Sequence, residues 1–354
     1  MTAKRSADSG VQTQRVKRDE SVTLLHGAGG EMMNALIADV LTKIKNKNAG
    51  GIGLESLDDG AAIPLTQGGY LIFTTDTHVV KPIFFPGGDI GRLSISGTVN
   101  DLAMMGAAPV ALTSAIVMED GFVISDLRRI VTSMDKATQE VNAAIVTGDT
   151  KVMEKGALDQ IIINTAGIGF VKEPVRDSGL KPGNKLIITG TIGDHGIAVL
   201  AAREDFQFRT ELRSDVAPIW HTVKAALDAG GASITAMKDP TRGGVASALN
   251  DMAHKSGVEV VIEEEFLPIN KSIRAAAEML GIDVLEVANE GKAIVGVEAD
   301  RAEAVLNAIQ KTAYGKHAAL IGEVKTGKKV LMKTRIGGTR FVDAPLGDPV
   351  PRVC

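Results

Sequence analysis

The chain has a single cysteine, Cys354, and it is the last residue of the sequence. One thiol cannot form a disulfide or a cysteine-based zinc site within the chain, which leaves packing, covalent chemistry or an intermolecular bond. Pro349 and Pro351 favour an extended arm, whose end has few neighbours to pack against. We therefore expect a mobile thiol that is available for covalent chemistry. The alternative is a cysteine without a function on a frayed tail.

Several aspartates stand where they could bind a metal ion. They lie beside glycines or at the ends of predicted strands: Asp58 and Asp59 before Gly60, Asp76 after an apolar run, Asp101 beside Asn100, and Asp149 after Gly148. Carboxylates that converge from such positions can hold Mg²⁺, which combines a few carboxylates with water and nucleotide phosphates. An aspartate next to glycine is more often a turn former. Both interpretations stay open on these residues alone.

A glycine-rich segment, residues 26–30, precedes a predicted helix that begins near Glu31. Free backbone amides at the start of a helix can hold a phosphate, so Gly29 and Gly30 are candidate anion-binding residues. Met32 stands where a dinucleotide fingerprint needs a third glycine, and the chain lacks the lysine-containing phosphate loop. The segment also resembles an esterase oxyanion loop, but the sequence contains no Gly-x-Ser-x-Gly nucleophile motif.

Two further motifs start predicted helices. His195 lies in the run Gly-Asp-His-Gly, and residues 239–244 read Asp-Pro-Thr-Arg-Gly-Gly. Ligand contact and ordinary loop packing are both open for each of them. The six histidines of the chain lack the spacing of a zinc site.

Strands and helices that must position these residues alternate along the whole chain, which predicts an α/β fold. Strands are predicted at 69–75, 110–118, 144–147, 160–171, 185–189, 259–262, 293–297 and 318–324. Helices are predicted at 31–43, 89–104, 125–141, 194–202, 216–229, 242–255, 271–280 and 301–310.

Length and composition favour two domains. The 354 residues are 44% hydrophobic and 23% charged, as in ordinary globular proteins. Two prolines and two glycines in residues 172–184 mark a boundary. We predict a disordered extension (1–20), an N-terminal domain (21–176), a C-terminal domain (177–325) and a tail (326–354).

Charge and hydropathy exclude several classes of protein. The net charge of −4 and the single Trp and two Tyr leave neither a basic patch nor a stacking surface for nucleic acid. No apolar run approaches the ~18 residues of a membrane span. No secretory signal is recognisable, and we expect a cytoplasmic protein.

Together these segments resemble the HypE family of hydrogenase maturation proteins, the carbamoyl dehydratases. The resemblance spans residues 22–354, and the final Pro-Arg-Val-Cys is its most specific part, with Val353 in place of the usual isoleucine. The other matching stretches are HGAGG (26–30), DDGAA (58–62), residues 74–109, TGDTKV (147–152), GTIGDHGIAVL (190–200), DPTRGG (239–244) and ANEGK (288–292). In the second domain Val284 stands where the family often has proline.

The resemblance implies a two-domain architecture like that of aminoimidazole ribotide synthetase, the PurM-like fold. It further implies a homodimer paired through the N-terminal domains, with ATP and Mg²⁺ bound near the pairing surface. A carbamoyltransferase resembling HypF would supply the carbamoyl group, and a complex resembling HypC with HypD would receive the cyanide.

The resemblance also implies roles for individual residues. Cys354 would carry a thiocarbamate whose oxygen is phosphorylated by ATP and lost as phosphate, which leaves a thiocyanate. Glu290 would take protons from the nitrogen, and Lys151 would offset developing negative charge. Asp58, Asp76, Asp101 and Asp149 would bind Mg²⁺, with Asn100, Asp101, Asp149, Gly29 and Gly30 around the nucleotide.

Two alternatives remain at this stage. One is another ATP-dependent phosphotransferase of the same superfamily, such as a thiamin-monophosphate kinase, with Cys354 incidental. The other is a nucleotide-regulated assembly scaffold without enzymatic activity.

Overall fold

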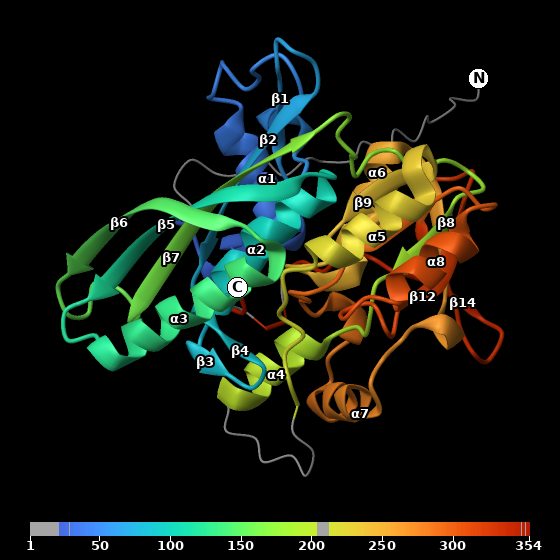
Figure 1. Ribbon diagram of the computed structural model, residues 1–354. Coiled ribbons are helices and arrows are strands. Elements are labelled where there is room, and N and C mark those ends of the chain that lie inside the picture. Colours follow the sequence, from blue (N-terminus) through green and yellow to red (C-terminus); the bar gives the residue numbers. More distant parts are fainter. Residues whose placement is uncertain (1–20, 28, 204–211, 348, 351) are drawn as a thin grey trace, which may run out of the picture.

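The computed structural model describes residues 21–27, 29–203, 212–347, 349–350 and 352–354. The predicted disordered extension, residues 1–20, and Pro351 lie outside the described residues. Two mixed sheets with their helices form two bodies that lie side by side (Figure 1). No helix of the described residues is long and apolar enough to cross a membrane.

The N-terminal half folds into a five-stranded sheet with two long helices against it (Figure 1). In their order across the sheet the strands are β1 (Ala61–Pro64), β2 (Tyr70–His78), β7 (Ile161–Val171), β5 (Ala108–Glu119) and β6 (Ala144–Met153). The helices are α2 (Ile90–Met104) and α3 (Ile124–Val141). β5 and β6 are parallel, and α3 makes the crossover between them that a parallel pair requires. The remaining elements of this half are η1 (Leu24–Gly27), α1 (Gly30–Leu41), η2 (Leu54–Ser56), β3 (Phe84–Phe85) and β4 (Gly88–Asp89).

Alternation along β2 shows which face of this sheet is covered. Ile72, Thr74 and His78 are buried, whereas Phe73 and Thr75 between them are exposed. The buried side chains face α2, whose N-terminus is capped by the Asp89 side chain accepting from Arg92 N at 2.9 Å. Side chains at Ile72, Thr74, Asp76 and His78 therefore share the covered, inner face of the sheet.

The C-terminal half forms a seven-stranded sheet. In their order across the sheet the strands are β14 (Thr339–Phe341), β13 (Val330–Lys333), β10 (Glu259–Glu263), β12 (Ala319–Lys325), β8 (Lys185–Ile188), β11 (Ile294–Val297) and β9 (Ile234–Lys238). The helices of this half are α4 (Asp194–Arg203), α5 (Trp220–Gly230), η3 (Gly231–Ser233), α6 (Gly244–Ser256), η4 (Glu264–Phe266), α7 (Lys271–Leu280), η5 (Val284–Glu286) and α8 (Ala302–Gln310).

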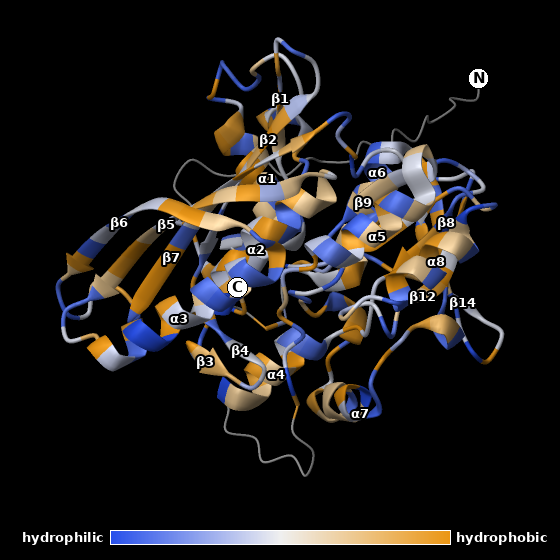
Figure 2. Ribbon diagram, in the orientation of Figure 1, coloured by the Kyte–Doolittle hydropathy of each residue, from blue (hydrophilic) through white to orange (hydrophobic). Residues whose placement is uncertain are grey.

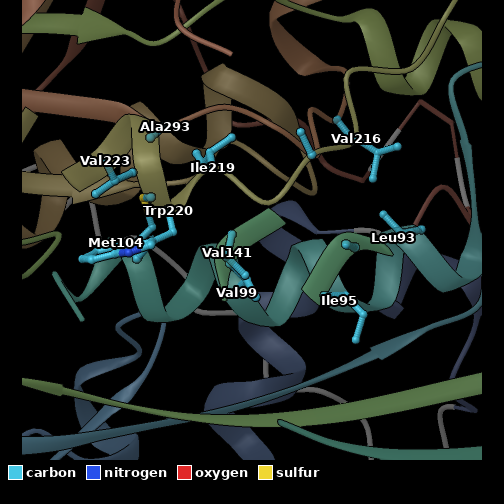
Figure 3. Close-up of a cluster of buried hydrophobic side chains, with 14 of the residues drawn as sticks. Leu93, Ile95, Val99, Met104, Val141, Val216, Ile219, Trp220, Val223 and Ala293 are labelled. Atoms are coloured by element: carbon cyan, nitrogen blue, oxygen red, sulfur yellow. The ribbon is translucent and has the colours of Figure 1, made fainter. Parts of the chain in front are cut away.

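A hydrophobic cluster joins the two halves along α2. Leu93, Val99 and Met104 of α2 face Ile219, Trp220 and other residues of the C-terminal half across it (Figure 3). The same cluster contains Val350 and Val353, which are 0% and 2% exposed, and Cys354 packs against it. The domain junction and the end of the chain therefore share one core.

Every predicted strand and helix corresponds to an observed element; the strand predicted at 144–147 continues six residues further in β6, and all other ends agree within four residues. Six short strands were not predicted: β1, β3, β4, β9, β13 and β14. β13 and β14 contradict the prediction of an arm that begins at residue 326, because both pair within the seven-stranded sheet. Strands of three or four residues among Lys, Gly and Thr carry too little apolar periodicity to be recognised. We call residues 343–354, which follow the last strand, the terminal segment.

Candidate active site

The end of the terminal segment lies docked between the two halves of the chain. Val79 N donates to Cys354 O and Lys81 N donates to Arg352 O, both at 3.2 Å. Pairing of 79 with 354 and 81 with 352 is the pattern of antiparallel strands. The prediction of a mobile thiol with few neighbours is therefore wrong for this conformation, because backbone pairing and burial of Val353 hold the segment.

Charged side chains hold the same segment from two directions. Arg203 Nη2 donates to Arg352 O at 2.8 Å, and Arg203 Nε donates to Lys81 O at 2.9 Å. Arg352 Nη1 pairs with Asp159 Oδ2 at 2.8 Å, which lies 2.9 Å from Lys81 Nζ. α4 of one domain and β2 with its following loop in the other thus both contact the docked residues.

Glu290 lies buried close to this docked end. Its side chain is 2% exposed, and its Oε1 atom has no hydrogen-bond partner. Burial and then the negative charges of Asp76 and Asp239 raise the pKa of Glu290 well above its ordinary value, against the opposing effect of Arg242. A carboxylate that is desolvated and unpaired is a strong base once it has lost its proton.

Arg242 is the cation that the prediction from sequence did not single out. Its pKa is raised, first by the charge of ionised Cys354 and then, against burial, by Asp76, Glu290 and Asp101. Its side chain is exposed to solvent. The arginine of the Asp-Pro-Thr-Arg-Gly-Gly motif therefore lies among the thiol, the candidate base and the acidic residues.

Four aspartates gather beside this group. Burial and then the charges of Asp239, Asp76 and Asp59 raise the pKa of Asp101 well above its ordinary value. Burial and then Asp59 raise the pKa of Asp239 to about 7. Burial alone would raise the pKa of Asp76, but His78 and Arg242 hold it well below its ordinary value. Mutual repulsion of this kind fits a site that a cation would neutralise.

The structure brings together two of the four predicted metal ligands, Asp76 and Asp101, and adds Asp59 and Asp239. Asp58 instead pairs with Arg176 at 3.1 Å and accepts from Asp177 N at 3.3 Å. Among the described residues no three His, Cys, Asp or Glu side chains are arranged to hold a metal ion by themselves. The aspartates therefore fit a Mg²⁺ ion that takes most of its ligands from phosphates and water.

Asp149 and Lys151 lie elsewhere on the sheet. Asp76 pairs with Thr165, Thr165 with Ser114, and Ser114 with Gly148. Directly paired residues point to the same face, so Asp149, one residue beyond Gly148, points to the opposite, outer face. Lys151 shares that face and pairs with Asp149 at 2.5 Å, with both side chains more than 60% exposed. Within one chain neither residue lies with Glu290.

Asn100 positions Glu290 through the backbone. Its Nδ2 donates to Ala217 O and Glu290 O, both at 3.1 Å, and its Oδ1 accepts from Ile219 N at 2.9 Å. Asp215 Oδ1 accepts from Glu290 N at 3.1 Å. The buried Asn100 amide thus connects α2 to the loop that carries the candidate base, and these bonds occupy both ends of the amide.

Gly29 and Gly30 allow close packing at the start of α1. Both have positive φ values, 78° and 72°. A Cβ atom at Gly29 would lie 2.9 Å from Arg242 Cβ, and one at Gly30 would overlap Pro345 O. The glycines therefore let the start of α1 approach both Arg242 and the terminal segment, beside the acidic residues.

Two functional candidates were missed in the sequence because their roles depend on the docked segment. For His195 and for the 239–244 motif, the sequence leaves both ligand contact and ordinary loop packing open. The structure places the His195 ring against Val353 O at 2.7 Å and Arg242 near Cys354. The only features of the sequence that could have indicated a function for His195 and Arg242 are the Gly-Asp-His-Gly and Asp-Pro-Thr-Arg-Gly-Gly motifs that contain them.

Comparison with known proteins first defines the class. Residues 57–171 match the N-terminal domain, and residues 181–333 the C-terminal domain, of the AIR synthase related proteins. The chain therefore has the two domains of this superfamily, which confirms the predicted PurM-like α/β fold.

Relatives then define the family. Carbamoyl dehydratase HypE of Rhizobium leguminosarum bv. viciae is 44% identical, over 94% of this chain and 95% of that protein. A HypE chain solved in a HypE–HypF complex is 46% identical with a TM-score of 0.82, covering 88% of this chain and all of that one. A HypE solved in complex with ATP is 40% identical with a TM-score of 0.78, over 94% of this chain and all of that one. The chain belongs to the carbamoyl dehydratase HypE family.

Proposed function

We propose that this protein is an ATP-dependent carbamoyl dehydratase of nickel-iron hydrogenase maturation, which converts a carbamoyl group on Cys354 into a thiocyanate. The observation that carries the proposal is the docked end of the chain. Backbone pairing at Val79 and Lys81 holds the end that carries the chain's single cysteine, and Cys354 and Glu290 both raise the pKa of Arg242, while the buried Oε1 atom of Glu290 has no hydrogen-bond partner.

The first chemical step activates the carbamoyl oxygen. That oxygen attacks the γ-phosphorus of ATP, so that a new O–P bond forms and the bond to ADP breaks. The nitrogen gives up one of its two protons, and the product on Cys354 is an imidate phosphate. Arg242 lies where it can offset negative charge on the sulfur side of this group.

The second step breaks the C–O bond. The nitrogen loses its remaining proton, the C≡N bond forms, and phosphate leaves with the oxygen. We propose Glu290 as the base, because its raised pKa makes its carboxylate a stronger proton acceptor than an exposed glutamate. Asn100 and Asp215 keep its backbone in place while the proton is transferred.

Asp76 and Asp101, which are half-buried, and the buried Asp239 are the residues that we propose for Mg²⁺, since the charges of these carboxylates raise the pKa values of Asp101 and Asp239. When bound, the ion would offset the phosphate charge of ATP. Asp58 has Arg176 as its partner, and Asp149 lies on the other face of the sheet. In a single chain these two residues do not contribute to that group.

We propose a homodimer that pairs through the outer face of the five-stranded sheet. All ten residues of the edge strand β6 are exposed, and large apolar side chains lie uncovered on it and on its neighbours. They include Val110, Val146 and Phe170, and Figure 2 shows apolar colouring on β5, β6 and β7. Uncovered apolar patches of this kind mark interaction surfaces.

Pairing through this face would give Lys151 a role. Lys151 and Asp149 stand on the outer face, away from Glu290 of their own chain. In a dimer their place would be at the contact with the second copy. We therefore propose that Lys151 of one subunit completes the site of the other.

The remaining partners follow from the chemistry. A carbamoyltransferase resembling HypF must load Cys354, and a HypF partner is present in the solved complex of a relative. An iron-carrying complex resembling HypC with HypD would accept the cyanide group. We propose that these reactions take place in the cytoplasm, where ATP is available.

ATP consumption tests the proposal against the kinase alternative, which is not favoured because full-length relatives are named carbamoyl dehydratase. We expect ATP turnover only after Cys354 has been carbamoylated, and none in Cys354→Ala. Equal ATP turnover by Cys354→Ala and the wild type would contradict the proposed function. A form that binds ATP but never consumes it when loaded would support the scaffold alternative.

A further inference from the structure

The docked end of the chain is held by one side-chain contact directly next to the cysteine. His195 is fully buried at the first turn of α4, and its Nε2 atom lies 2.7 Å from Val353 O. The Val353 carbonyl is part of the peptide group that carries the Cys354 nitrogen. A hydrogen bond to this oxygen therefore fixes the orientation of the peptide plane from which the thiol side chain extends.

The direction of this hydrogen bond is determined by its partners. A carbonyl oxygen can only accept, so Nε2 must carry the proton. Burial lowers the pKa of His195, so the ring is neutral and its Nδ1 atom is an acceptor. Ser214 Oγ lies 2.7 Å from Nδ1 and donates to it, while accepting from Val216 N at 3.0 Å. The Val353 carbonyl thus requires the Nε2–H tautomer, and the Ser214 hydroxyl is compatible with that tautomer because it can donate to Nδ1.

The ring is also fixed by packing. Phe85 meets it edge to face, with the ring centroids 5.4 Å apart. In the docked arrangement both ring nitrogens are bonded, Nδ1 to Ser214 Oγ and Nε2 to Val353 O, and only the second of these bonds depends on the terminal segment. The pairing partners at Val79 and Lys81, by contrast, are backbone amides that any residue would supply.

We propose that His195, held by Ser214, is a positioning residue that keeps the docked end of the chain in place and orients Cys354 toward Glu290. The importance of this role for the reaction rests on the proposed function, whereas the docking role does not. The His195 hydrogen bond adds to the backbone pairing at Val79 and Lys81 and to the contacts of Arg203 and Asp159 with Arg352, and its own net contribution is small enough to be reversed when the segment leaves to meet a transferase.

Alkylation of the thiol tests the docking role directly, since Cys354 is the only cysteine and its labelling reports this segment alone. The full chain is treated with iodoacetamide, and labelling is followed by intact mass. We expect His195→Ala to be labelled roughly tenfold faster than the wild type, because Val353 O loses its buried donor. His195→Gln, which retains a donor near the Nε2 position, should return to within about threefold of the wild type. His254→Ala, an exposed histidine on α6, is the matched control and should not change.

Ser214→Ala keeps the proposal testable if His195→Ala fails to fold. It should be labelled about threefold faster than the wild type, because the ring loses its tautomer partner. Unchanged labelling of His195→Ala, equal labelling of His195→Gln and His195→Ala, or unchanged labelling of Ser214→Ala where His195→Ala does not fold, would overturn the proposal.

A second measurement separates this role from general damage. With the carbamoylated protein, His195→Ala should slow thiocyanate formation in a single turnover while leaving ATP affinity unchanged. His195→Gln should restore most of that rate. If labelling follows these expectations but no variant or wild type forms thiocyanate, the docking role stands and the proposed function fails. Wild-type thiocyanate formation by His195→Ala would contradict the positioning role.

Discussion

Glu290 and Lys151 were both predicted as catalytic residues, and the structure places them in opposite surroundings. Glu290 is buried, held through its backbone by Asn100 and Asp215, and close to Arg242 and the docked Cys354. Lys151 lies on the exposed edge strand β6 with Asp149 as its recorded partner. Within one chain, protein groups enclose the Glu290 carboxylate, whereas the Lys151 ammonium group is exposed to solvent. In the dimer that we propose, one half of the site would belong to the fold of one chain and the other half to the assembly.

The largest effect on the reaction rate is expected from substitution of Glu290, the buried residue of the two. Glu290→Gln keeps the shape of the side chain but cannot accept a proton, so dehydration should slow by about 10²–10⁴-fold. Carbamoylation of Cys354 should continue, and the carbamoylated chain should accumulate in intact-mass spectra. Glu286→Gln, a partly exposed glutamate of the same loop, is the control. Thiocyanate formation by Glu290→Gln at the wild-type rate would remove Glu290 from the mechanism.

Mixing two inactive variants tests whether the exposed Lys151 acts in the site of a second subunit. Glu290→Gln and Lys151→Ala are purified separately, mixed in equal amounts and allowed to exchange subunits. If Lys151 acts in the site of the other subunit, half of the dimers are hybrids with one intact site, and about a quarter of wild-type activity should return. No recovery, with subunit exchange shown by native mass spectrometry, would contradict a shared site.

The link between the two domains at Asn100 should show a smaller effect, and mainly on stability. Asn100→Ala leaves the Ala217 and Glu290 carbonyls and the Ile219 amide without their buried partner. We expect a loss of about 2–4 kcal/mol in the free energy of unfolding, measured with urea. Asn307→Ala on the exposed face of α8 serves as the control. Normal stability with lost ATP binding would favour the original prediction that Asn100 is a nucleotide ligand.

The smallest expected effect is a pH dependence of the free energy of unfolding that arises from the acidic residues. Burial and then Asp59 raise the pKa of Asp239 to about 7, far above the ~3.9 of an unfolded chain. The folded state thus binds more protons than the unfolded state, and stability decreases as the pH rises through the folded pKa. From about pH 6.5 to about pH 8.5 the free energy of unfolding should fall by on the order of 1 kcal/mol.

Two variants of this experiment identify the cause. Asp239→Asn should reduce the slope of the pH dependence by the contribution of that carboxyl group, and the slope that remains is expected from Asp177, whose pKa burial also raises to about 7. Mg²⁺ with ATP should flatten it in the wild type, because a cation favours the ionised carboxylates. An equal slope in all three thermal melting series would show that the acidic residues do not control stability in this range.

Helices and long strands could be predicted because their hydrophobic periodicity is local. The predicted helix 271–280 and the predicted strand 160–171 lie within one residue of α7 and β7. β13 and β14 were not recognised. Thr339 to Phe341 is a strand because it pairs with β13, and its own three residues show no hydrophobic alternation that would predict one.

The site was predictable only where a motif and its neighbours lie close in sequence. The separation of Asp149 from Asp76 depends on the register of three strand pairs, which no local pattern contains. The roles of His195 and Arg242 depend on residues more than one hundred positions away. Contacts over such distances follow from the tertiary fold and cannot be derived from spacing.

The most direct test of the central claim is intact-mass analysis of the full chain during one reaction cycle. The protein is incubated with the carbamoyltransferase and its substrates, then transferred to Mg²⁺ and ATP. We predict a gain of one carbamoyl group on Cys354, followed by the loss of one water molecule that occurs only with ATP. Cys354→Ala should show neither change. Loss of water without ATP, or a carbamoyl group that ATP leaves intact on the wild-type chain, would contradict the account.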